Sequence, residues 1–532
     1  MDKLLVLGAE AVAVAALDEG ISGVYAYPGT PSTEITEYIQ KSPKAKENKI
    51  HSSWSANEKT AYESALGMSY AGKRSLVCMK HVGLNVAADA FMNSALTGIN
   101  GGMVVLVADD PSMHSSQNEQ DTRMYGKFAY LPLLEPSNQQ EVYDSVRFAF
   151  GFSETVKLPV LVRITTRLSH SRAIVERRDI TQENLLSPET DSRKWILLPA
   201  IARQRFSGLL GKQPDLVGYS EKSAFNYVIK GSGTKGIIAF GIAFNYVMEV
   251  IQEHNLNIPV LKISQYPLPE KAIKSFYEQY ETVLIAEEGY PVYEELLRGY
   301  FNTPKIQGRL DGTLPRMGEL SPDIIAQALG VTVVTGKSVP EETPGRPPRL
   351  CDGCSHRDLF EAMNIVIAGY DDKHVFGDIG CYTLGALSPY NAINTCVDMG
   401  ASVTMAKGAA DAGLRPAVAV IGDSTFTHSG ITGLLDAVND KSPVTIIISD
   451  NYTTAMTGGQ DSAGTNKLFN ICAGVGVEPE HIRTIIPLKK HLEENISVLK
   501  EEFEYQGVSV ILATRECIQT AMRNKRNSKK ND

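Results

Sequence analysis

The sequence predicts an α/β protein built on parallel sheets. Short apolar runs such as SLVCM, MVVLVA, AVAVIG and VTIIIS alternate with stretches of helical periodicity, which is typical of strand, helix and parallel strand units. The chain has 532 residues, too many for one hydrophobic core, and about three or four domains are expected at ~150 residues each. We therefore predict two related parallel-sheet domains, one near each end of the chain, with a smaller α/β domain between them.

The chain begins with an apolar stretch, MDKLLVLGAEAVAVAALDEG, which we interpret as a strand, a turn at Gly8 and a helix. It differs from a signal peptide because Glu10, Asp18 and Glu19 interrupt it and no small-residue cleavage site follows. No apolar run approaches the ~20 residues that cross a bilayer, so we expect a soluble, cytoplasmic protein without a membrane partner. The net charge of -9 argues against a nucleic-acid partner.

Two irregular stretches separate the predicted domains. KSVPEETPGRPPR contains four prolines, which prevent regular structure, and a polar stretch lies near 177–215. The basic cluster RNKRNSKK at the end is interpreted as a solvated, frayed terminus. The predicted organisation is a first domain at 1–172, a linker region at 173–230, a middle domain at 231–336, a proline-rich linker at 337–349, a last domain at 350–522 and a basic tail at 523–532.

The first and last domains share a local pattern. AGKRSLVCMKHVG precedes MVVLVADD in the first, and AGLRPAVAVIGDS precedes VTIIISDN in the last. Val77 and Val105 lie 28 positions apart, as do Ala419 and Ile447, so one offset of 342 superposes both strand pairs. The shared turn before each first strand favours an old duplication, although any βαβ unit has about 30 residues.

Asp423 and Asn451 each follow an apolar strand of the last domain, with one helix between the two strands. A right-handed crossover makes such strands parallel and brings both side chains to the carboxyl edge of the sheet, where open α/β sheets bind ligands. Gly422 permits close backbone approach, and the helix expected after Ser429 offers N–H groups to an anion. Two oxygen ligands with diphosphate oxygens suit Mg²⁺. The alternative is that both are turn or cap residues.

The texts GDSTFTHSGI and DNYTTAMTGGQ resemble the thiamine-diphosphate motif, and in particular the alpha subunits of the indolepyruvate:ferredoxin oxidoreductase family. YPGTPSTEI, MKHVGLN, ADDPSMHSSQNEQDTR, RITTRLSHSR, CDGCSHR and GDIGCYTLG extend the resemblance over nearly the whole chain. It implies the thiamine-diphosphate-binding fold. The first domain would be its pyrimidine-binding (Pyr) domain, the last its diphosphate-binding (PP) domain, and the middle one a transketolase C-terminal-like domain.

The resemblance also implies which residues bind the cofactor. Asp423, Asn451 and the Thr453 carbonyl would hold Mg²⁺ on the diphosphate of thiamine diphosphate. The full set of residues implied to bind the cofactor is Gly29, Lys80, Gly377, Asp378, Gly380, Tyr382, Thr383, Leu384, Gly400, Gly422, Asp423, Ser424, Thr425, Asn451, Thr453, Thr454, Ala455 and Met456.

Three residues of the first domain are implied to be catalytic. Glu58 would contact N1′ of the aminopyrimidine, and Thr30 and His81 would face the reacting carbon. Taken alone, Glu58 would be a surface helix residue and His81 a structural one, but the small residues that follow Glu58 indicate close packing. Arg123 or Arg167 would pair with a substrate carboxylate, and nothing in the sequence chooses between them.

The seven cysteines are an odd number in a long chain and do not resemble a disulfide framework. By the resemblance, Cys351, Cys354, Cys381 and Cys517 would hold one [4Fe–4S] cluster, which takes four thiolates. A zinc site that includes His356, or plain reduced thiols, are the alternatives. Where the family has CPGCPHR this chain has CDGCSHR, which makes the turn less rigid and adds a charge.

The activity implied by the resemblance is oxidative decarboxylation of arylpyruvates to arylacetyl-CoA and CO₂, with reduction of ferredoxin. The substrates would be indolepyruvate, phenylpyruvate or hydroxyphenylpyruvate, and the partners a beta subunit, ferredoxin and CoA in a hetero-oligomer with an alpha dimer. Family members often continue into a ferredoxin-like domain that is expected to be missing here, so electrons would leave through another protein. The alternatives are a non-oxidative thiamine-diphosphate-dependent decarboxylase and a non-catalytic scaffold.

Overall fold

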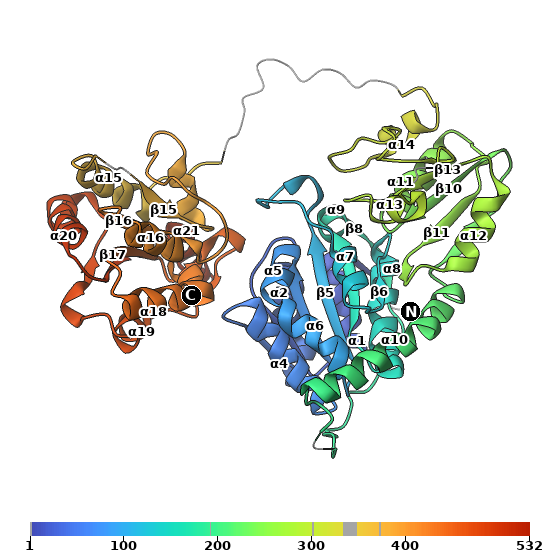
Figure 1. Cartoon of the computed structure of the whole chain (residues 1–532), viewed down its shortest axis with the longest axis horizontal. Coiled ribbons are helices and arrows are strands. Elements are labelled where there is room, and N and C mark those ends of the chain that lie inside the picture. The colour runs from blue at the N-terminus through green and yellow to red at the C-terminus, as the bar shows by residue number, and fades with distance from the viewer. Residues whose placement is uncertain (1–2, 192, 301–302, 334–347, 372–373, 532) are drawn as a thin grey trace. The chain divides into compact units, whose positions relative to one another are not determined.

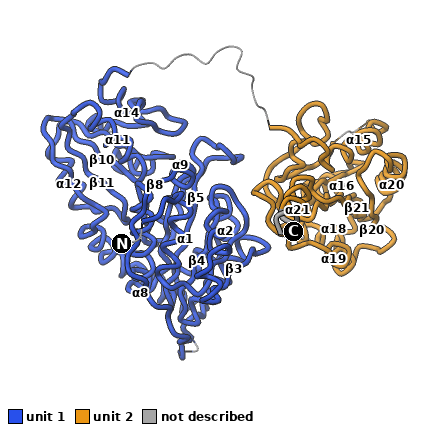
Figure 2. Tube along the Cα trace, turned by 180° about the vertical axis from the view of Figure 1, so that it is seen from behind, with its two compact units in different colours: residues 1–337 blue, residues 338–532 orange. Residues whose placement is uncertain are grey.

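The computed structural model describes residues 3–191, 193–300, 303–333, 348–371 and 374–531. These form two compact units, Met1–Lys337 and Ser338–Asp532 (Figure 2). The first unit contains both the predicted first domain and the predicted middle domain. Most of the proline-rich linker lies outside the described residues, and the finer domain boundaries stay predictions.

A seven-stranded sheet with the strand order β12-β6-β7-β5-β4-β2-β3 organises the first part of unit 1 (Figure 1). Strands β4, β5 and β7 are buried along their whole length, because helices cover both faces of the sheet. The strands are β2 (Gly23–Ala26), β3 (His51–Trp54), β4 (Ser75–Lys80), β5 (Met103–Asp109), β6 (Leu133–Leu134), β7 (Val160–Thr165) and β12 (Gln265–Tyr266). The helices are α1 (Gly8–Asp18), α2 (Thr33–Lys41), α3 (Pro43–Glu47), α4 (Glu58–Tyr70), α5 (His81–Val86), α6 (Ala88–Thr97), α7 (Thr122–Phe128), α8 (Gln139–Val156), α9 (Thr166–His170) and α10 (Pro199–Glu221).

The first strand is not part of this sheet. β1 (Lys3–Leu7) pairs antiparallel with β8 (Arg172–Glu176), and α1 follows at Gly8 as predicted. A Cβ atom on Gly8 would lie 2.0 Å from the carbonyl oxygen of Leu168. Glycine at this position therefore allows α1 to begin against the main chain of α9.

The middle part of unit 1 has a five-stranded sheet with the order β14-β13-β10-β11-β9. β12 continues from this part into the first sheet, where Gln265 and Tyr266 pair with Leu134 and Leu133. The two parts of unit 1 thus share a sheet as well as a hydrophobic core. The strands are β9 (Tyr227–Ile229), β10 (Lys235–Phe240), β11 (Val260–Ile263), β13 (Thr282–Ala286) and β14 (Ile306–Gln307), and the helices are α11 (Ala243–Glu253), α12 (Glu270–Gln279), α13 (Val292–Arg298) and α14 (Pro322–Ala328).

Unit 2 is a five-stranded parallel sheet with the order β15-β16-β17-β21-β20. Alternate residues of its central strands belong to two separate hydrophobic clusters, so both faces are covered. The strands are β15 (Val375–Gly377), β16 (Ala417–Gly422), β17 (Val444–Asp450), β20 (Ile482–Ile485) and β21 (Ser509–Thr514), and a short ribbon joins β18 (Thr453–Thr454) to β19 (Gln460–Asp461). The helices are α15 (Ser355–Ile367), α16 (Ala401–Asp411), α17 (Asp423–Thr425), α18 (Ile431–Asp440), α19 (Leu468–Gly474), α20 (Leu492–Glu504) and α21 (Ile518–Asn531).

The strand pairs compared in the sequence are parallel neighbours in both units. Val77 pairs with Val105, but Ala419 pairs with Ile446 rather than with Ile447. A single offset of 342 therefore does not superpose both pairs, because the registers differ by one residue.

The C-terminal segment is helical where a frayed tail was expected, since α21 runs through the basic cluster. Within the described residues, no helix is both long enough and apolar enough to cross a bilayer.

Candidate active site

Asp423 and Asn451 lie at one edge of the unit 2 sheet, as predicted, because β16 and β17 are adjacent and parallel. Asp423 is 2% exposed and Asn451 7%. The Oδ2 atom of Asp423 has no hydrogen-bond partner among the described residues, and burial raises the pKa of Asp423 to about 7. The side chain of Asn451 accepts a hydrogen bond from the Thr453 amide at 3.2 Å.

These residues fit a divalent cation. The Asp423 carboxylate is hydrogen-bonded to Ser462, but a buried carboxylate oxygen such as Oδ2 that lacks a partner among the described residues is costly. A cation beside it would offset that cost with the oxygen ligands that Mg²⁺ prefers. Asp423 is therefore the member of the predicted set whose surroundings most call for a metal. The roles of Asp423, Asn451 and Thr453 as ligands stay predictions.

The helix after β16 begins earlier than predicted. It starts at Asp423 itself, and a π-helical turn over Phe426–Gly430 precedes α18. Single π-helical turns are frequent at functional sites. Ser424 and Thr425 lie in this first turn, where Thr454 donates to Ser424 at 2.9 Å and Thr425 donates to the Ile379 carbonyl at 3.0 Å.

Asp378 has a structural role that the sequence did not indicate. Its Oδ2 atom accepts hydrogen bonds from the amides of Gly400 and Ser402, both at 3.1 Å, and from the Ser402 hydroxyl at 2.6 Å. The Tyr382 hydroxyl donates to the other oxygen, Oδ1. Because these contacts occupy the buried carboxylate, Asp378 orients the start of α16 at the rim of the site. Burial raises its pKa to about 6.

Two positions beside Tyr382 require glycine, because the Tyr382 ring fills the space that a side chain would need. A Cβ atom would lie 2.2 Å from the ring at Gly380 and 2.9 Å from it at Gly422. Other members of the predicted set lie on the same chain segments. The Gly377 amide donates a hydrogen bond to Thr395, and the Gly380 amide donates one to Thr383. Ala455 and Met456 lie in a short 3₁₀ turn, and Leu384 lines the pocket that also contains the four cysteines described below.

The residues predicted in the first domain gather in unit 1 around the end of β4. Lys80 ends that strand, His81 begins α5, and a Cβ atom on Gly29 would lie 3.3 Å from the Lys80 Cβ. Glu58, 5% exposed, begins α4. Its carboxylate occupies the space beside Gly83, where a Cβ atom would lie 2.6 Å from Oε1. Thr30 is half-buried in the adjoining loop.

A loop that the sequence did not assign to the site covers Lys80 and His81. Lys80 Nζ donates to the Ser115 carbonyl at 2.6 Å, and His81 Nε2 lies 3.3 Å from the Asn118 carbonyl. Burial lowers the pKa of Lys80 to about 8 and also lowers the pKa of His81. His81 is therefore neutral near pH 7, and Lys80 is a largely buried cation at the end of β4. The sequence SMHSSQNEQ was part of the family resemblance, but this contact could not be predicted from it, because Lys80 and His81 contact main-chain carbonyls of the loop.

Arg123 does not have the role considered for it. It is fully buried, and its guanidinium is paired with Asp121 at 2.6 Å and with Glu287 at 2.8 Å. Its Nη2 atom also donates to the main-chain carbonyls of Glu288 and Tyr290. Within the described residues its charge is therefore balanced by carboxylates of unit 1 itself. Arg167 is partly exposed and pairs with Glu319 at 2.8 Å.

The four cysteines of the predicted cluster line one pocket of about 750 Å³ in unit 2, together with Asn451, Ala455 and three arginines. Cys351 is exposed and the other three are half-buried. Burial, and then the neighbouring cysteines, raise the pKa of Cys381 to about 12. His356, which the zinc alternative used, is buried, and its Nδ1 atom lies 3.1 Å from Cys354 Sγ.

A single metal ion would need its ligands within ~2.3 Å of one point. In the described part of the chain, no group of three or more His, Cys, Asp or Glu side chains has that arrangement. A four-iron cluster is larger and takes one thiolate at each iron, so four thiols around one pocket fit its ligand chemistry. The cluster stays a proposal.

Two family models match the chain, one to each unit. Residues 14–206 match the pyruvate flavodoxin/ferredoxin oxidoreductase thiamine-diphosphate-binding family, and residues 378–511 match the C-terminal thiamine-pyrophosphate-binding domain of thiamine pyrophosphate enzymes. The chain is 38% identical to indolepyruvate oxidoreductase subunit IorA of Archaeoglobus fulgidus, over 97% of this chain and 86% of that protein. It is 39% identical to subunit IorA of Methanothermobacter marburgensis, over 97% and 87%.

The chain belongs to the indolepyruvate oxidoreductase subunit IorA family. This confirms the resemblance on which the sequence-based site was built, and the two matched models confirm the thiamine-diphosphate-binding fold class. As a member of the IorA family the chain is a subunit of an oxidoreductase. A solved 2-oxoglutarate:ferredoxin oxidoreductase from Magnetococcus marinus aligns with a TM-score of 0.49 and 16% identity over 62% of this chain and 65% of that one.

Proposed function

We propose that the chain is the catalytic alpha subunit of an enzyme that converts an arylpyruvate and coenzyme A to the arylacetyl-CoA and CO₂, passing two electrons to ferredoxin. Indolepyruvate, phenylpyruvate and hydroxyphenylpyruvate are the candidate substrates. The observation that carries the proposal is the buried Oδ2 atom of Asp423, which finds no hydrogen-bond partner in the described part of the chain and lies at the carboxyl edge of the unit 2 sheet, as Asn451 does. The shared family membership with IorA proteins supports the reaction type.

When bound, thiamine diphosphate supplies the electron sink on which a 2-oxoacid loses CO₂. Asp423, Asn451 and the Thr453 carbonyl would hold its Mg²⁺, and Glu58 would hold a proton at its carboxyl group beside the aminopyrimidine ring. Lys80 would attract the substrate carboxylate, in place of Arg123. His81, neutral at physiological pH, would donate or accept a hydrogen bond rather than carry charge.

The proposed partners follow from the same reaction. A beta subunit would complete the enzyme, in a hetero-oligomer that contains an alpha dimer. The four cysteines would hold one [4Fe–4S] cluster that conducts electrons to ferredoxin.

The test uses the chain purified with its beta subunit under anaerobic conditions. Binding of thiamine diphosphate with Mg²⁺ is measured by calorimetry, and CO₂ release, thioester formation and ferredoxin reduction are measured with a panel of 2-oxoacids. Asp423→Ala is expected to weaken cofactor binding by ~100-fold, because a metal ligand is lost. The matched control is Asp436→Ala, an exposed carboxylate on α18.

Glu58→Gln is expected to lower the rate by ~100-fold or more, the usual loss when a general acid or base is removed. Glu63→Gln, on the exposed side of the same helix, should leave the rate unchanged. Full activity in either Asp423→Ala or Glu58→Gln would contradict the proposed site. An aldehyde as the only product, from protein without iron, would show a non-oxidative decarboxylase instead.

A further inference from the structure

The segment that follows β21 carries Cys517, a predicted cluster ligand, and is hydrogen-bonded to the main chain at Asn451, a predicted magnesium ligand. The amide of Arg515 donates to the Asp450 carbonyl at 3.0 Å, and the amide of Cys517 donates to the Asn451 carbonyl at 3.2 Å. The main chain that carries a cluster cysteine is thus hydrogen-bonded to the main chain that carries a magnesium ligand. The two centres share their supporting backbone.

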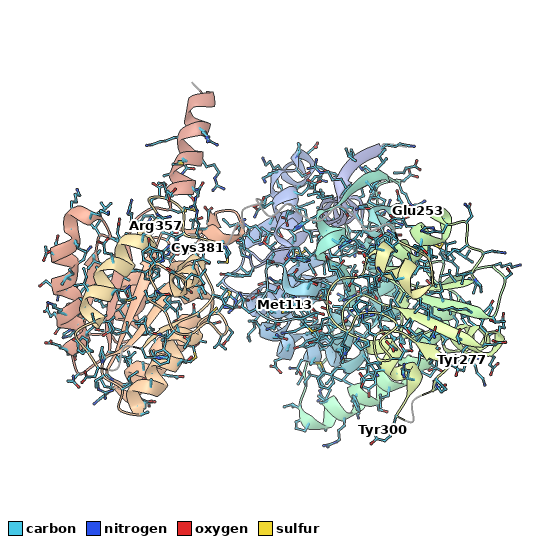
Figure 3. The ribbon with its side chains drawn as sticks, turned by 90° about the horizontal axis from the view of Figure 1, so that it is seen from above. Met113, Glu253, Tyr277, Tyr300, Arg357 and Cys381 are labelled. Carbon is cyan, nitrogen blue, oxygen red and sulfur yellow. The ribbon has the colours of Figure 1, made fainter. Side chains whose placement is uncertain are left out.

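Arg523, on α21, makes a second connection. Its Nη1 and Nη2 atoms donate to the carbonyls of Gly458 and Gly459, both at 2.8 Å. A planar guanidinium suits two neighbouring acceptors of this kind. Arg523 also lines the cysteine pocket, with Ile518 and Met522 of the same helix. In Figure 3 this C-terminal helix stands out from the rest of its unit, and Cys381 and Arg357 are labelled below it.

The glycine pair in TGGQ is shaped for this contact. Gly458 has φ 120° and Gly459 has φ 84°, a region that residues with a Cβ atom rarely adopt. A Cβ atom on Gly459 would also lie 3.1 Å from Arg523 Nη2. The two glycines therefore direct their carbonyl groups toward α21. The predicted role of this loop in cofactor binding does not by itself account for that contact.

The contact continues from the glycine pair to the magnesium edge. The Gly459 amide donates to the Thr454 carbonyl at 3.1 Å, and the Thr454 hydroxyl donates to Ser424 at 2.9 Å. Ser424 directly follows Asp423. A chain of hydrogen bonds thus runs from α21, beside the cysteines, to the residues predicted to hold the diphosphate and its metal.

We propose that Arg523 is a positioning residue that couples the cysteine pocket to the diphosphate loop, so that an occupied pocket strengthens binding of thiamine diphosphate. The inference rests on the proposed function for the identity of the two ligands. A cluster bound through Cys517 holds the start of α21 in place, and Arg523 then holds the loop at 454–460 in its binding shape. Such coupling is reciprocal, since each ligand favours the same arrangement.

The first arm of the test needs no cofactor. Amide hydrogen exchange at 454–460 is compared in the full-length wild-type chain, Arg523→Ala, Arg523→Lys and Arg526→Ala. Loss of two charge-assisted hydrogen bonds is expected to speed exchange at these amides by ~10-fold in Arg523→Ala, with a smaller change in Arg523→Lys and no change in β16. Arg526 lines the same pocket, and the described residues show no hydrogen bond from it to this loop, so Arg526→Ala is the matched control. Unchanged exchange in Arg523→Ala would overturn the inference.

The second arm measures the coupling itself. The Kd of thiamine diphosphate with Mg²⁺ is determined by calorimetry for iron-loaded and iron-free chain. In the wild type and in Arg526→Ala, iron loading is expected to tighten binding by ~10-fold. In Arg523→Ala that ratio should fall to ~1 at the same iron content, and a ratio equal to that of the wild type would overturn the coupling, as would a wild-type ratio of 1. A wild type that binds no thiamine diphosphate would refute the proposed function, and the exchange arm would still decide whether Arg523 positions the loop.

Discussion

At the scale of single residues, Glu58 shows how a motif becomes a site. The sequence predicted Glu58 from the text around it, and the small residues after it indicated close packing. The structure adds that Gly83, from the separate text MKHVGLN, leaves the space that the carboxylate occupies. A contact between residues 25 positions apart cannot be read from either motif alone.

Gly83→Ala is expected to lower activity. The added methyl group would lie 2.6 Å from both Cγ and Oε1 of Glu58, so the whole Glu58 side chain must move. A loss of ~10-fold or more in kcat is expected, because catalysis depends on placement within fractions of an ångström.

Gly67→Ala is the control for that change. Nothing lies within 4 Å of a Cβ atom at Gly67 on α4, so this variant should keep full activity and gain slight stability from helix propensity. Wild-type kcat in Gly83→Ala, measured with the beta subunit and ferredoxin, would show that Glu58 has no role that depends on its position.

At the scale of elements, the start of α16 depends on Asp378. The sequence placed Asp378, Tyr382 and Gly400 in the cofactor cradle by family pattern. The structure shows that the Asp378 carboxylate accepts hydrogen bonds from two backbone amides, those of Gly400 and Ser402, at the start of α16.

Asp378→Ala is expected to weaken binding of thiamine diphosphate by ~10-fold, since the amides of Gly400 and Ser402 lose their acceptor and the helix start shifts. Iron content should not change. The matched control is Asp398→Ala, an exposed carboxylate on the same loop. Calorimetric binding in Asp378→Ala as tight as in the wild type would contradict a positioning role.

The helix after β16 was expected to follow Ser429. It begins at Asp423, because Thr427 donates to the Ser424 carbonyl at 3.0 Å and Thr432 to the Ser429 carbonyl at 2.9 Å. Hydroxyl groups that bond back to the preceding turn are compatible with a helix. Composition alone does not distinguish them from loop residues.

At the scale of the whole molecule, a buried ionic network joins the two parts of unit 1. Arg123 of the first part pairs with the carboxylate of Glu287 in the middle part, and Arg163 of the first part donates to the main-chain carbonyl of Glu288. The Glu288 carboxylate itself pairs with Arg309 of the middle part. Burial raises the pKa of both Glu287 and Glu288 to about 7, from an ordinary 4.5. Because burial favours the protonated form of both carboxyl groups even beside their arginine partners, this junction should be sensitive to pH.

The stability of the first unit is expected to fall as the pH rises from ~5 to ~7. In that window the unfolded chain releases the protons of Glu287 and Glu288 while the folded chain keeps them, so rising pH favours unfolding. Above pH 7 both states are ionised at these groups, and their contribution becomes constant. Urea midpoints at pH 5, 6, 7 and 8 measure the trend.

Glu288→Gln should flatten that dependence, since glutamine does not titrate and keeps an acceptor for the Leu320 amide. The exposed Glu270→Gln is the control. An identical slope in Glu288→Gln and in the wild type would show that Glu288 does not titrate in this range.

The sequence by itself determined the fold class, the family and the parallel strands that bring Asp423 and Asn451 to one edge, because periodicity and motif spacing are local properties of the chain. Only the tertiary structure showed that Arg123 is paired with carboxylates of unit 1 and that Ser115 and Asn118 of one loop contact Lys80 and His81. It also showed that β12 pairs with a strand of the first sheet and that Arg523 contacts the TGGQ turn. The physical reason is the same in each case. Burial and hydrogen-bond partners depend on residues that are distant in the sequence. The sequence alone therefore does not distinguish an arginine that can bind a substrate from one that is already paired with carboxylates of the protein.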